Sequence, residues 1–492
     1  MRLAIVLCAA ACALQAQVTY KVRLTSNDGD KIVELPAEQY VTGVLAGESS
    51  TFQSDEALKA MAVAARTYAA RLRGRHASEG FDFCATTHCQ RFEAANIPAR
   101  LSSSAAATAG ELLWFEGKPA FAVYTRDCGG KLESVTAVWP DIEAPYLPFH
   151  VDPYCTRHAE PDWLWTASPA QIVQALHASN LQSPTGLRRV VIRSRSGSGR
   201  AQTLQLEGDS NVVLNAGAFR FAVGRKLGWN TVRSDLYEID NSSTITFHGK
   251  GQGHGVGLCQ LGADAMGREG RSYRDILAFY YPGASVSRLA TGFHWAALGG
   301  EGVTVLTLHP ELDRSVLVLA ESARRNAQDQ LHLAAPGTIT VRLYPDLDSF
   351  RNATGEPGWV AAHTSASTID LQPASILNRN GGVKPVLEHE MLHVVFESHA
   401  VAGLPIWFRE GLVEYLSTGD HHVAHGQPSA SETGLRQRKS RADADRAYAQ
   451  AVAQVAALIR RYGETTVLGW IERGLPADVK YSSDNSATTK SK

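Results

Sequence analysis

The segment His389-Glu390-Met391-Leu392-His393 constrains the fold of this chain more than any other feature, because it specifies both a helix and a metal site. Residues four apart lie on one face of a helix, so the imidazoles of His389 and His393 can reach one zinc ion. Glu390 lies beside them, where a carboxylate can take a proton from a metal-bound water molecule. Apolar residues on both sides of the motif favour a helix that packs into a core. The motif therefore predicts a catalytic zinc centre.

Two histidines leave a catalytic zinc ion short of one protein ligand, since such sites usually have three. The segment from Pro405 to Tyr415 is expected to form the next helix, and it places Glu410 and Glu414 one turn apart. We predict that Glu410 is the third ligand and that Glu414 orients one of the histidines. Two alternatives stay open, because chance matches to so short a pattern are common: a coincidental motif, and a metal-stabilised scaffold without activity.

Residues 333–468 resemble the gluzincin peptidases, in particular the peptidase-MA-like group. The resemblance rests on the His-Glu-x-x-His motif and on the Glu410-Gly411 pair that follows it on a second helix. It implies a zinc-dependent peptidase with Glu410 as third ligand and a peptide or protein as substrate. It also implies that the strand Thr368–Leu371, with segment 357–362, forms the edge strand above the active site. Tyr448 is a candidate to stabilise the oxyanion of the tetrahedral intermediate, although packing within a helix is the more frequent role of such a residue.

The chain is too long for a single hydrophobic core, which predicts more than one domain. It has 492 residues, of which 44% are hydrophobic and 20% charged, as is typical of a globular protein. Its formal net charge of -1 gives no electrostatic reason to expect nucleic acid as a partner. Because the composition changes near residue 290, we expect a mixed α/β domain at residues 17–290 and a zincin-like domain at residues 291–475, together an α+β fold. Residues 476–492 are rich in Ser, Thr and Lys and are expected to form a disordered tail.

Residues 1–16 have the pattern of a secretory signal peptide, because Arg2 precedes a short apolar run that ends in small residues. The run is too short to span a bilayer comfortably. Export predicts a secreted or periplasmic protein of the cell envelope; a lipoprotein attached through Cys12 and a buried first helix are the alternatives. Seven cysteines are present. Removal of the leader leaves an odd number, so at least one thiol is free or binds a metal ion.

Local patterns predict several secondary-structure elements. In the first domain we expect a hairpin at residues 20–35, a short helix at 36–44, a helix at 54–72 and a hairpin at 189–206. In the second domain we expect strands at residues 303–305, 316–318 and 339–343 around a helix at 320–333.

Two segments of the first domain contain residue types that carry chemistry. Glu48 follows an apolar helical turn, where a carboxyl group can have a raised pKa and donate a proton. An exposed helix end is the more frequent role of such a residue. The glycine-rich segment 249–257 allows the backbone to approach a ligand or another strand closely, which makes His254 a candidate contact.

A third segment holds metal-binding residue types. Cys84, His88 and Cys89 can bind zinc with His76 as a fourth ligand. The alternative is a disulfide, for example between Cys84 or Cys89 and one of Cys128 and Cys155. The spacing does not decide between them.

Taken together, these stretches resemble the SpoIID/LytB family over about residues 18–288. The stretches that carry the resemblance are Gly47-Glu48, the helix 56–68, Thr87-His88-Cys89-Gln90, Cys128-Gly129-Gly130-Lys131, Val138-Trp139, Pro145-Tyr146-Leu147 and residues 251–263. The sequence differs from the usual family pattern at Arg126-Asp127, where small hydroxyl residues are common, and at Cys259, which is often serine.

The family includes lytic transglycosylases of peptidoglycan and proteins that enhance cell-wall amidases. The resemblance implies that Glu48 is the catalytic acid, which protonates the glycosidic oxygen while the 6-hydroxyl of the sugar closes an anhydro ring. It implies glycan contacts at four polar positions, Arg66, Lys131, His254 and Gln260. It also favours a second, structural zinc ion at His76, Cys84, His88 and Cys89. The expected partners are peptidoglycan glycan strands and a cell-wall amidase. The alternative is a non-catalytic module that binds glycan or enhances an amidase.

Overall fold

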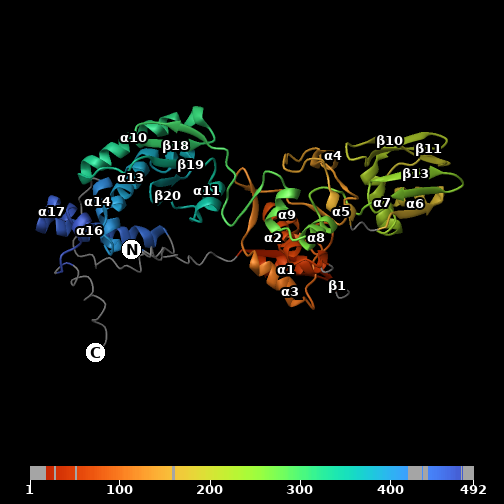
Figure 1. The fold of residues 1–492 in the computed structure, drawn as a ribbon, viewed down its shortest axis with the longest axis horizontal. Coiled ribbons are helices and arrows are strands. Elements are labelled where there is room, and N and C mark those ends of the chain that lie inside the picture. The colour runs from red at the N-terminus through yellow and green to blue at the C-terminus, as the bar shows by residue number, and fades with distance from the viewer. Residues whose placement is uncertain are drawn as a thin grey trace. The chain divides into compact units, whose positions relative to one another are not determined.

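The computed structural model describes residues 18–26, 29–49, 52–157, 161–418, 435, 441–477 and 479 (Figure 1). The predicted signal peptide and residues 480–492 of the predicted tail lie outside this range. The chain divides into two compact units, of which one spans residues 16–292 and the other contains residues 293–492. Both units contain helices and strands, as expected for an α+β protein. No helix within the described ranges combines the length and the apolar character needed to cross a lipid bilayer.

A small sheet and a bundle of helices form the centre of the first unit. The hairpin of β1 (Thr19–Ser26) and β2 (Gly29–Pro36) is antiparallel, and β3 (Phe83–Cys84) pairs in parallel with β1. Pro36 ends the hairpin and precedes α1 (Ala37–Glu48). Helix α2 (Asp55–Arg71) begins at Ser54, whose side chain accepts a hydrogen bond from the Ala57 amide.

Helix α2 is buried almost all round, because its many alanines let other helices approach closely. Its buried alanines are Ala57, Ala60, Ala62, Ala64, Ala65 and Ala69. It packs against α1 and three further helices: α3 (Ala99–Ala107), α8 (Gln260–Arg268) and α9 (Tyr273–Tyr280). The core thus joins residues that lie about two hundred positions apart in the sequence.

Short strands connect the helices of the first unit. One sheet has the order β16-β4-β5, and two further pairs join β15 with β6 and β7 with β8. These strands are β4 (Leu112–Phe115), β5 (Lys118–Pro119), β6 (Tyr124–Thr125), β7 (Lys131–Leu132), β8 (His150–Val151), β15 (Leu258–Cys259) and β16 (Ser285–Ser287). Two short helices, α4 (Val135–Val138) and α5 (Pro153–Arg157), lie between them in the sequence.

Residues 163–249 of the first unit build a lobe with its own hydrophobic core (Figure 1, yellow-green). Two three-stranded sheets, β10-β11-β12 and β13-β14-β9, are accompanied by two helices. The elements are β9 (Trp163–Ala167), α6 (Pro169–Ala178), β10 (Arg189–Arg195), β11 (Ala201–Glu207), β12 (Asn211–Asn215), α7 (Ala216–Leu227), β13 (Tyr237–Asn241) and β14 (Ile245–Gly249). The β10–β11 hairpin confirms the one predicted at residues 189–206.

The second unit contains a five-stranded sheet with the order β17-β18-β19-β21-β20. The strands are β17 (Ala296–Gly299), β18 (Val303–Thr307), β19 (Ile339–Leu343), β20 (Ala362–Ser365) and β21 (Thr368–Leu371). The helices are α10 (Pro310–Leu331), α11 (Leu347–Thr354), α12 (Ala374–Arg379), α13 (Val383–His399), α14 (Ile406–Thr418), α16 (Arg441–Tyr462), α17 (Glu464–Leu468) and α18 (Trp470–Arg473). One hydrophobic core joins the sheet with α10, α13, α14 and α16.

Two expectations for this sheet are wrong. Val316 and Val318 lie in α10 and not in a strand. The buried residues of α10 recur at helical spacing from Val316 to Leu331, and this apolar stripe outweighs the strand preference of two valines. The strand Thr368–Leu371 is not the edge strand either, because β21 pairs with β19 on one side and with β20 on the other. The edge strands of the sheet are β17 and β20.

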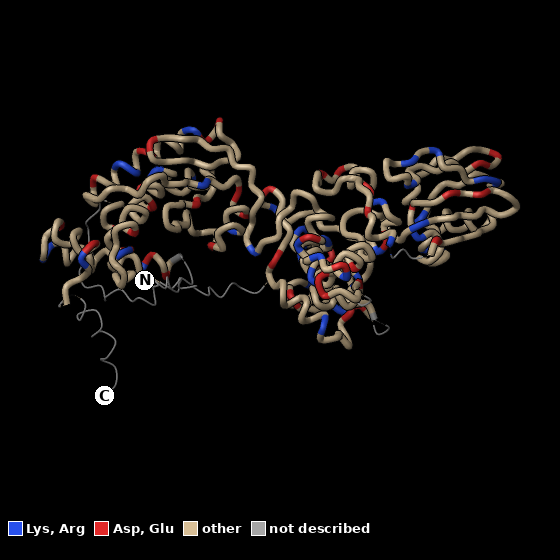
Figure 2. The backbone as a smooth tube through the Cα atoms, viewed as in Figure 1, with Lys and Arg blue, Asp and Glu red and all other residues tan. Residues whose placement is uncertain are grey.

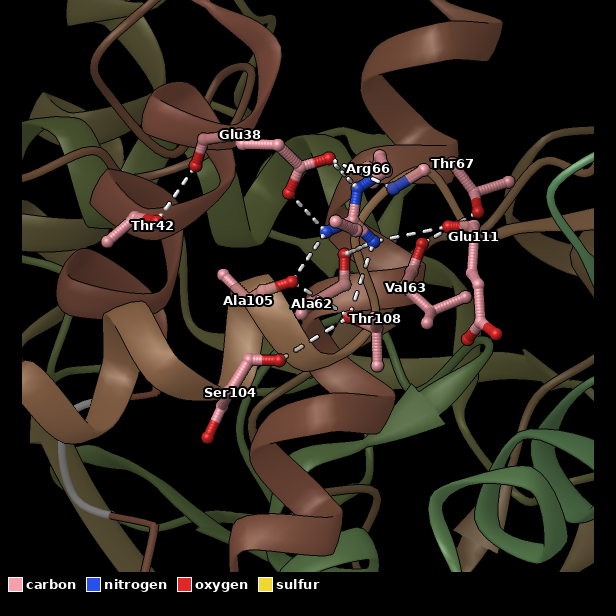
Figure 3. A network of polar contacts seen from close by, with 12 residues as sticks. Glu38, Thr42, Ala62, Val63, Arg66, Thr67, Ser104, Ala105, Thr108 and Glu111 are labelled. Carbon is pink, nitrogen blue, oxygen red and sulfur yellow. Dashed lines mark hydrogen bonds and ion pairs between the residues drawn. The ribbon is translucent and has the colours of Figure 1, made fainter. Parts of the chain in front are cut away.

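Acidic and basic residues alternate along both units without a long run of one sign (Figure 2). Arg66 of α2 is nevertheless deeply buried, and only 3% of it is exposed. Its Nη2 lies 2.6 Å from Oε2 of Glu38 in α1, and its Nη1 donates to the Glu111 carbonyl oxygen at 3.1 Å (Figure 3). Arg66 Nη2 also donates a hydrogen bond to the carbonyl oxygen of Ala105 in α3. Arg66 thus joins α1, α2 and α3, which corrects the expectation that it contacts a glycan.

We expect Arg66→Met to lower the free energy of unfolding by about 3 kcal/mol, because breaking a buried ion pair leaves its partners unsatisfied. The matched control is Arg71→Met in the exposed last turn of the same helix, which should change stability by less than about 0.5 kcal/mol. Urea denaturation followed by circular dichroism measures both. Equal stabilities of the two variants would contradict this role of Arg66.

Candidate functional sites

The carboxylate of Glu48, at the last position of α1, is held by the turn that follows β3. Its Oε1 accepts a hydrogen bond from the Arg91 backbone amide at 2.7 Å. The close approach depends on Gly47, because a Cβ atom there would lie 2.2 Å from the Arg91 carbonyl oxygen. Gly47 and Glu48 therefore pack closely against the turn at Arg91. Glu48 is thus not simply an exposed residue at the end of a helix.

Burial raises the pKa of the Glu48 carboxyl group above its usual value. The Arg91 amide, the Gln260 side chain and the charges of Arg91 and Arg126 act in the opposite direction but do not cancel the effect. A carboxyl group in this state holds its proton to a higher pH than an exposed one. This is the property that a general acid requires.

A buried network of hydrogen bonds fixes the turn that contacts Glu48. The Gln90 side chain accepts a hydrogen bond from the Tyr40 hydroxyl and donates one to the Tyr124 hydroxyl, both at 3.1 Å. Tyr124 lies close enough to Glu48 for the carboxylate charge to contribute to the raised pKa of its hydroxyl, of which burial is the main cause. The turn that presents Arg91 is thus fixed through its neighbour Gln90.

The same turn carries His88 and Cys89 of the predicted Cys–His cluster, and the structure brings them together with His76 and Cys84. The ligand atoms of His76, Cys84, His88 and Cys89 lie within 4.8 Å of one another. The Cys84 and Cys89 sulfurs are 3.5 Å apart, and His76 Nε2 is 3.4 Å from the Cys89 sulfur. A tetrahedral zinc ion with bonds of about 2.0–2.3 Å separates its ligand atoms by about 3.3–3.8 Å, so the four residues fit zinc. Oε1 of Glu79 lies 2.6 Å from Nδ1 of His76, the ring nitrogen that does not contact Cys89. A carboxylate in this position is common behind a metal-bound histidine.

The disulfide alternative for this cluster is not supported. All five cysteines in the described residues are free. Cys84 and Cys89 belong to one group of side chains, whereas Cys128, Cys155 and Cys259 belong to another. A bond from the first pair to Cys128 or Cys155 is therefore excluded by the fold.

The remaining candidates of the first unit take different places. Gln260, at the start of α8, hydrogen-bonds to Glu48. His254 is half-buried against Trp139, with ring centroids 4.9 Å apart, and burial together with Arg220 and Arg200 lowers its pKa to about 3. His254 is therefore neutral and offers hydrogen bonds but no charge. Lys131 is exposed on β7, and its glycan contact stays a prediction.

Sequence reasoning missed one cation of this site. Arg126 was noted only as a departure from a family pattern, but its charge acts directly on Glu48. The sequence signal that points to Arg126 is its position just before Cys128-Gly129-Gly130, a stretch that carries the resemblance. Arg126 can stabilise negative charge on a glycan or on the conjugate base of Glu48.

The structure brings the predicted zinc ligands of the second unit together as well. His389 and His393 lie one turn apart on α13, with their Nε2 atoms 3.2 Å apart. The Glu410 Oε2 from α14 is 3.5 Å from His393 Nε2, and all three ligand atoms lie within 4.8 Å of one another. Glu414 Oε2 is 3.1 Å from His389 Nδ1, the nitrogen that faces away from His393. The donor set fits a catalytic zinc ion with three protein ligands and a carboxylate behind one histidine.

The edge strand β20 supplies contacts that sequence reasoning missed. The Thr364 hydroxyl donates to Glu390 Oε2 at 2.6 Å. His363, the preceding residue, pairs with Glu356 at 3.0 Å, and this partner raises its pKa. No local pattern marks these two residues, because only the pairing of β20 with β21 carries them to α13.

Tyr448 lies in α16, partly buried against the hydrophobic core of the unit. This is the place of a packing residue. Its role as an oxyanion stabiliser stays a prediction.

These features define the class of protein. The first unit is a mixed α/β domain in which a recessed carboxylate is fixed by a turn bearing a Cys–His cluster. The second unit has a His–His–Glu cluster between two helices beside a mixed sheet.

Comparison with known proteins places the first unit. The family model for the stage II sporulation protein SpoIID matches residues 25–115. An uncharacterized protein of Brachyspira hyodysenteriae is 31% identical over 255 residues, which are 51% of this chain and 67% of the relative. Stage II sporulation protein D of Bacillus subtilis is 28% identical over 287 residues, 55% of this chain and 79% of the relative. The amidase enhancer of the same organism is 26% identical over 290 residues, 50% of this chain and 40% of the relative. The chain belongs to the SpoIID/LytB family through its N-terminal domain.

Proposed function

We propose that this protein remodels peptidoglycan at the cell envelope, with one activity in each unit. The first unit acts as a lytic transglycosylase on glycan strands, with Glu48 as the acid. The observation that carries this part is the raised pKa of a Glu48 carboxyl group that is fixed by Arg91 and Gln260. The names of two relatives, a sporulation protein and an amidase enhancer, support a role at the cell wall.

Several residues of this chain would assist the reaction. Protonated Glu48 gives its proton to the glycosidic oxygen, and the 6-hydroxyl of the same sugar attacks the anomeric carbon. The hydroxyl proton passes to a base, for which the newly formed Glu48 carboxylate is the nearest candidate. Gln260 and the Arg91 amide stabilise that carboxylate, because both hydrogen bonds favour its charged form. A bound zinc ion at the Cys–His cluster would hold the turn that presents Arg91.

The second unit acts as a zinc-dependent peptidase. His389, His393 and Glu410 would hold the ion, which supplies a polarised water molecule when bound. Glu390 would act as the base that accepts a proton from the attacking water and would return it to the leaving amine. Thr364 orients the Glu390 carboxylate through its 2.6 Å hydrogen bond.

Two other functions are alternatives, and the first of them has specific support. The relative named amidase enhancer favours a first unit that binds glycan and stimulates an amidase without cutting. A metal-stabilised scaffold in place of the peptidase is the second. Incubation of the purified chain with peptidoglycan, followed by mass spectrometry, separates them: soluble anhydro-muropeptides support the transglycosylase, whereas binding without soluble products supports the targeting module.

The hydrogen bond from Gln260 predicts a pH effect. The acid is active while Glu48 is protonated, so activity is present below the folded-state pKa and is lost as pH rises through it. Gln260→Leu removes a bond that favours the charged form, which raises the pKa further. We expect the descending limb of the kcat/KM profile for glycan cleavage to move to higher pH by on the order of one unit. A limb that stays in place would contradict the assignment of Glu48 as the titrating acid.

A further inference from the structure

Three cysteines and one aspartate meet in the first unit, apart from both Glu48 and the Cys–His cluster. Cys128 follows β6, Cys155 lies in α5, and Cys259 ends β15. Asp152 directly precedes α5. One ligand atom from each of the four residues lies within 4.8 Å of the others. Three separate segments, spread over more than a hundred residues, thus converge on one point.

Each side chain in this group presents a donor atom to the others. Asp152 Oδ2 lies 3.4 Å from the Cys128 sulfur, while its Oδ1 accepts a hydrogen bond from the Cys155 amide at 3.0 Å. One oxygen therefore begins the helix α5, and the other faces the sulfurs. The Cys259 sulfur accepts a hydrogen bond from the Cys128 amide at 3.3 Å, a contact that stabilises a thiolate.

The burial of these four side chains has a free-energy cost, because their charged forms are removed from water. All four residues are 0% exposed. The Asp152 carboxylate accepts hydrogen bonds from the Tyr280 hydroxyl and from the Tyr154 and Cys155 amides, and none of these donors carries a positive charge. A second carboxylate, Asp127, contacts the Cys155 sulfur at 3.0 Å. Arg200 is also buried, and its Nη2 donates to the Cys128 carbonyl oxygen at 2.7 Å. A divalent cation among the four side chains would offset the free-energy cost of burying their acidic groups.

We propose that Cys128, Cys155, Cys259 and Asp152 bind a single divalent metal ion of the zinc class. Three thiolates and one carboxylate are a donor set for a soft or borderline cation, and they exclude magnesium and calcium. Four protein ligands close a tetrahedral site, so the ion is structural and leaves no position for water. The ion links α5, α8 and the turn after β6. Because Cys259 directly precedes Gln260, the ion also fixes the residue that contacts Glu48.

Cobalt spectroscopy tests this site separately from the others. Within the described part of the chain, two of the three candidate clusters contain sulfur, and Cys84→Ser with Cys89→Ser removes sulfur from one of them. The full chain with these two substitutions is loaded with Co²⁺. We expect near-ultraviolet absorption from sulfur-to-cobalt charge transfer to persist, and to disappear when Cys155→Ser is added. A folded double variant that binds Co²⁺ without this absorption would overturn the proposal.

A second measurement does not require the Cys84→Ser and Cys89→Ser substitutions. Native mass spectrometry of the wild-type chain and of Cys155→Ser, each with Zn²⁺, should differ by one zinc ion. His389→Ala serves as the control, because it should lose an ion from the second unit and keep the cobalt–sulfur absorption of the first. Equal zinc content of wild type and Cys155→Ser, or a disulfide between any two of Cys128, Cys155 and Cys259, would overturn the site. Neither result bears on glycan cleavage by Glu48.

Discussion

Glu390→Gln is expected to lower kcat/KM for peptide hydrolysis by a factor of about 10³ or more while leaving zinc bound. A positioned general base contributes about 10²–10⁴ to such a reaction, and an amide cannot take the proton of the metal-bound water. The ligands His389, His393 and Glu410 are untouched by the substitution. Thr364 can keep its contact, because the amide oxygen of glutamine still accepts a hydrogen bond. The measurement combines zinc analysis with turnover of a peptide library that includes wall peptides.

The matched control is Glu388→Gln, two residues earlier on α13. That carboxylate faces Asn326 and Lys384 and not the histidine pair. The Glu388→Gln variant should hydrolyse peptides at the wild-type rate. Retained zinc with no hydrolysis in the wild-type protein would instead favour a metal-stabilised scaffold, and equal rates for Glu390→Gln and wild type would remove Glu390 from the mechanism.

The second large effect is expected at Glu48. Glu48→Gln should lower the rate of glycan cleavage by at least about 10²-fold, because the side chain can no longer donate a proton. The substitution is close to isosteric, and the amide oxygen can still accept the Arg91 hydrogen bond. Binding of the protein to insoluble peptidoglycan should therefore persist. Sedimentation with peptidoglycan and release of soluble muropeptides measure the two properties independently.

Glu93→Gln provides the control for this experiment, since Glu93 is an exposed carboxylate two residues beyond Arg91. It should cleave glycan as the wild type does. If Glu48→Gln and Glu93→Gln release products at the same rate, Glu48 is not the acid. The first unit is a targeting module if the wild type and both variants bind insoluble peptidoglycan and none of them releases soluble muropeptides.

The candidate metal-binding groups show which parts of a site can be predicted from sequence. His389 and His393 lie four residues apart on a helix, so their convergence follows from helix geometry alone. Glu410 required the further assumption that the next helix packs against the first, and the structure confirms that it does. The group around Cys128, Cys155 and Cys259 was beyond such reasoning, because only long-range packing joins these segments.

The burial of charge was equally hard to predict. Arg66 lies on the helix that carries the family resemblance, and the sequence gives no sign that Glu38 and three carbonyl oxygens would enclose it. The misassigned strand at 316–318 has a different cause, because the burial stripe of α10 becomes visible only over its full length. Local preference fails where a longer period or a distant partner decides.

Analysis of the sugar ends released from purified peptidoglycan by the wild-type chain tests the central claim most directly. An acid that works with the substrate's own 6-hydroxyl produces anhydro sugar ends and consumes no water. We expect anhydro ends on each soluble fragment, and we expect the fragments to form at a rate that depends on protonated Glu48. Fragments with ordinary reducing ends, formed by addition of water at the anomeric carbon, would contradict it.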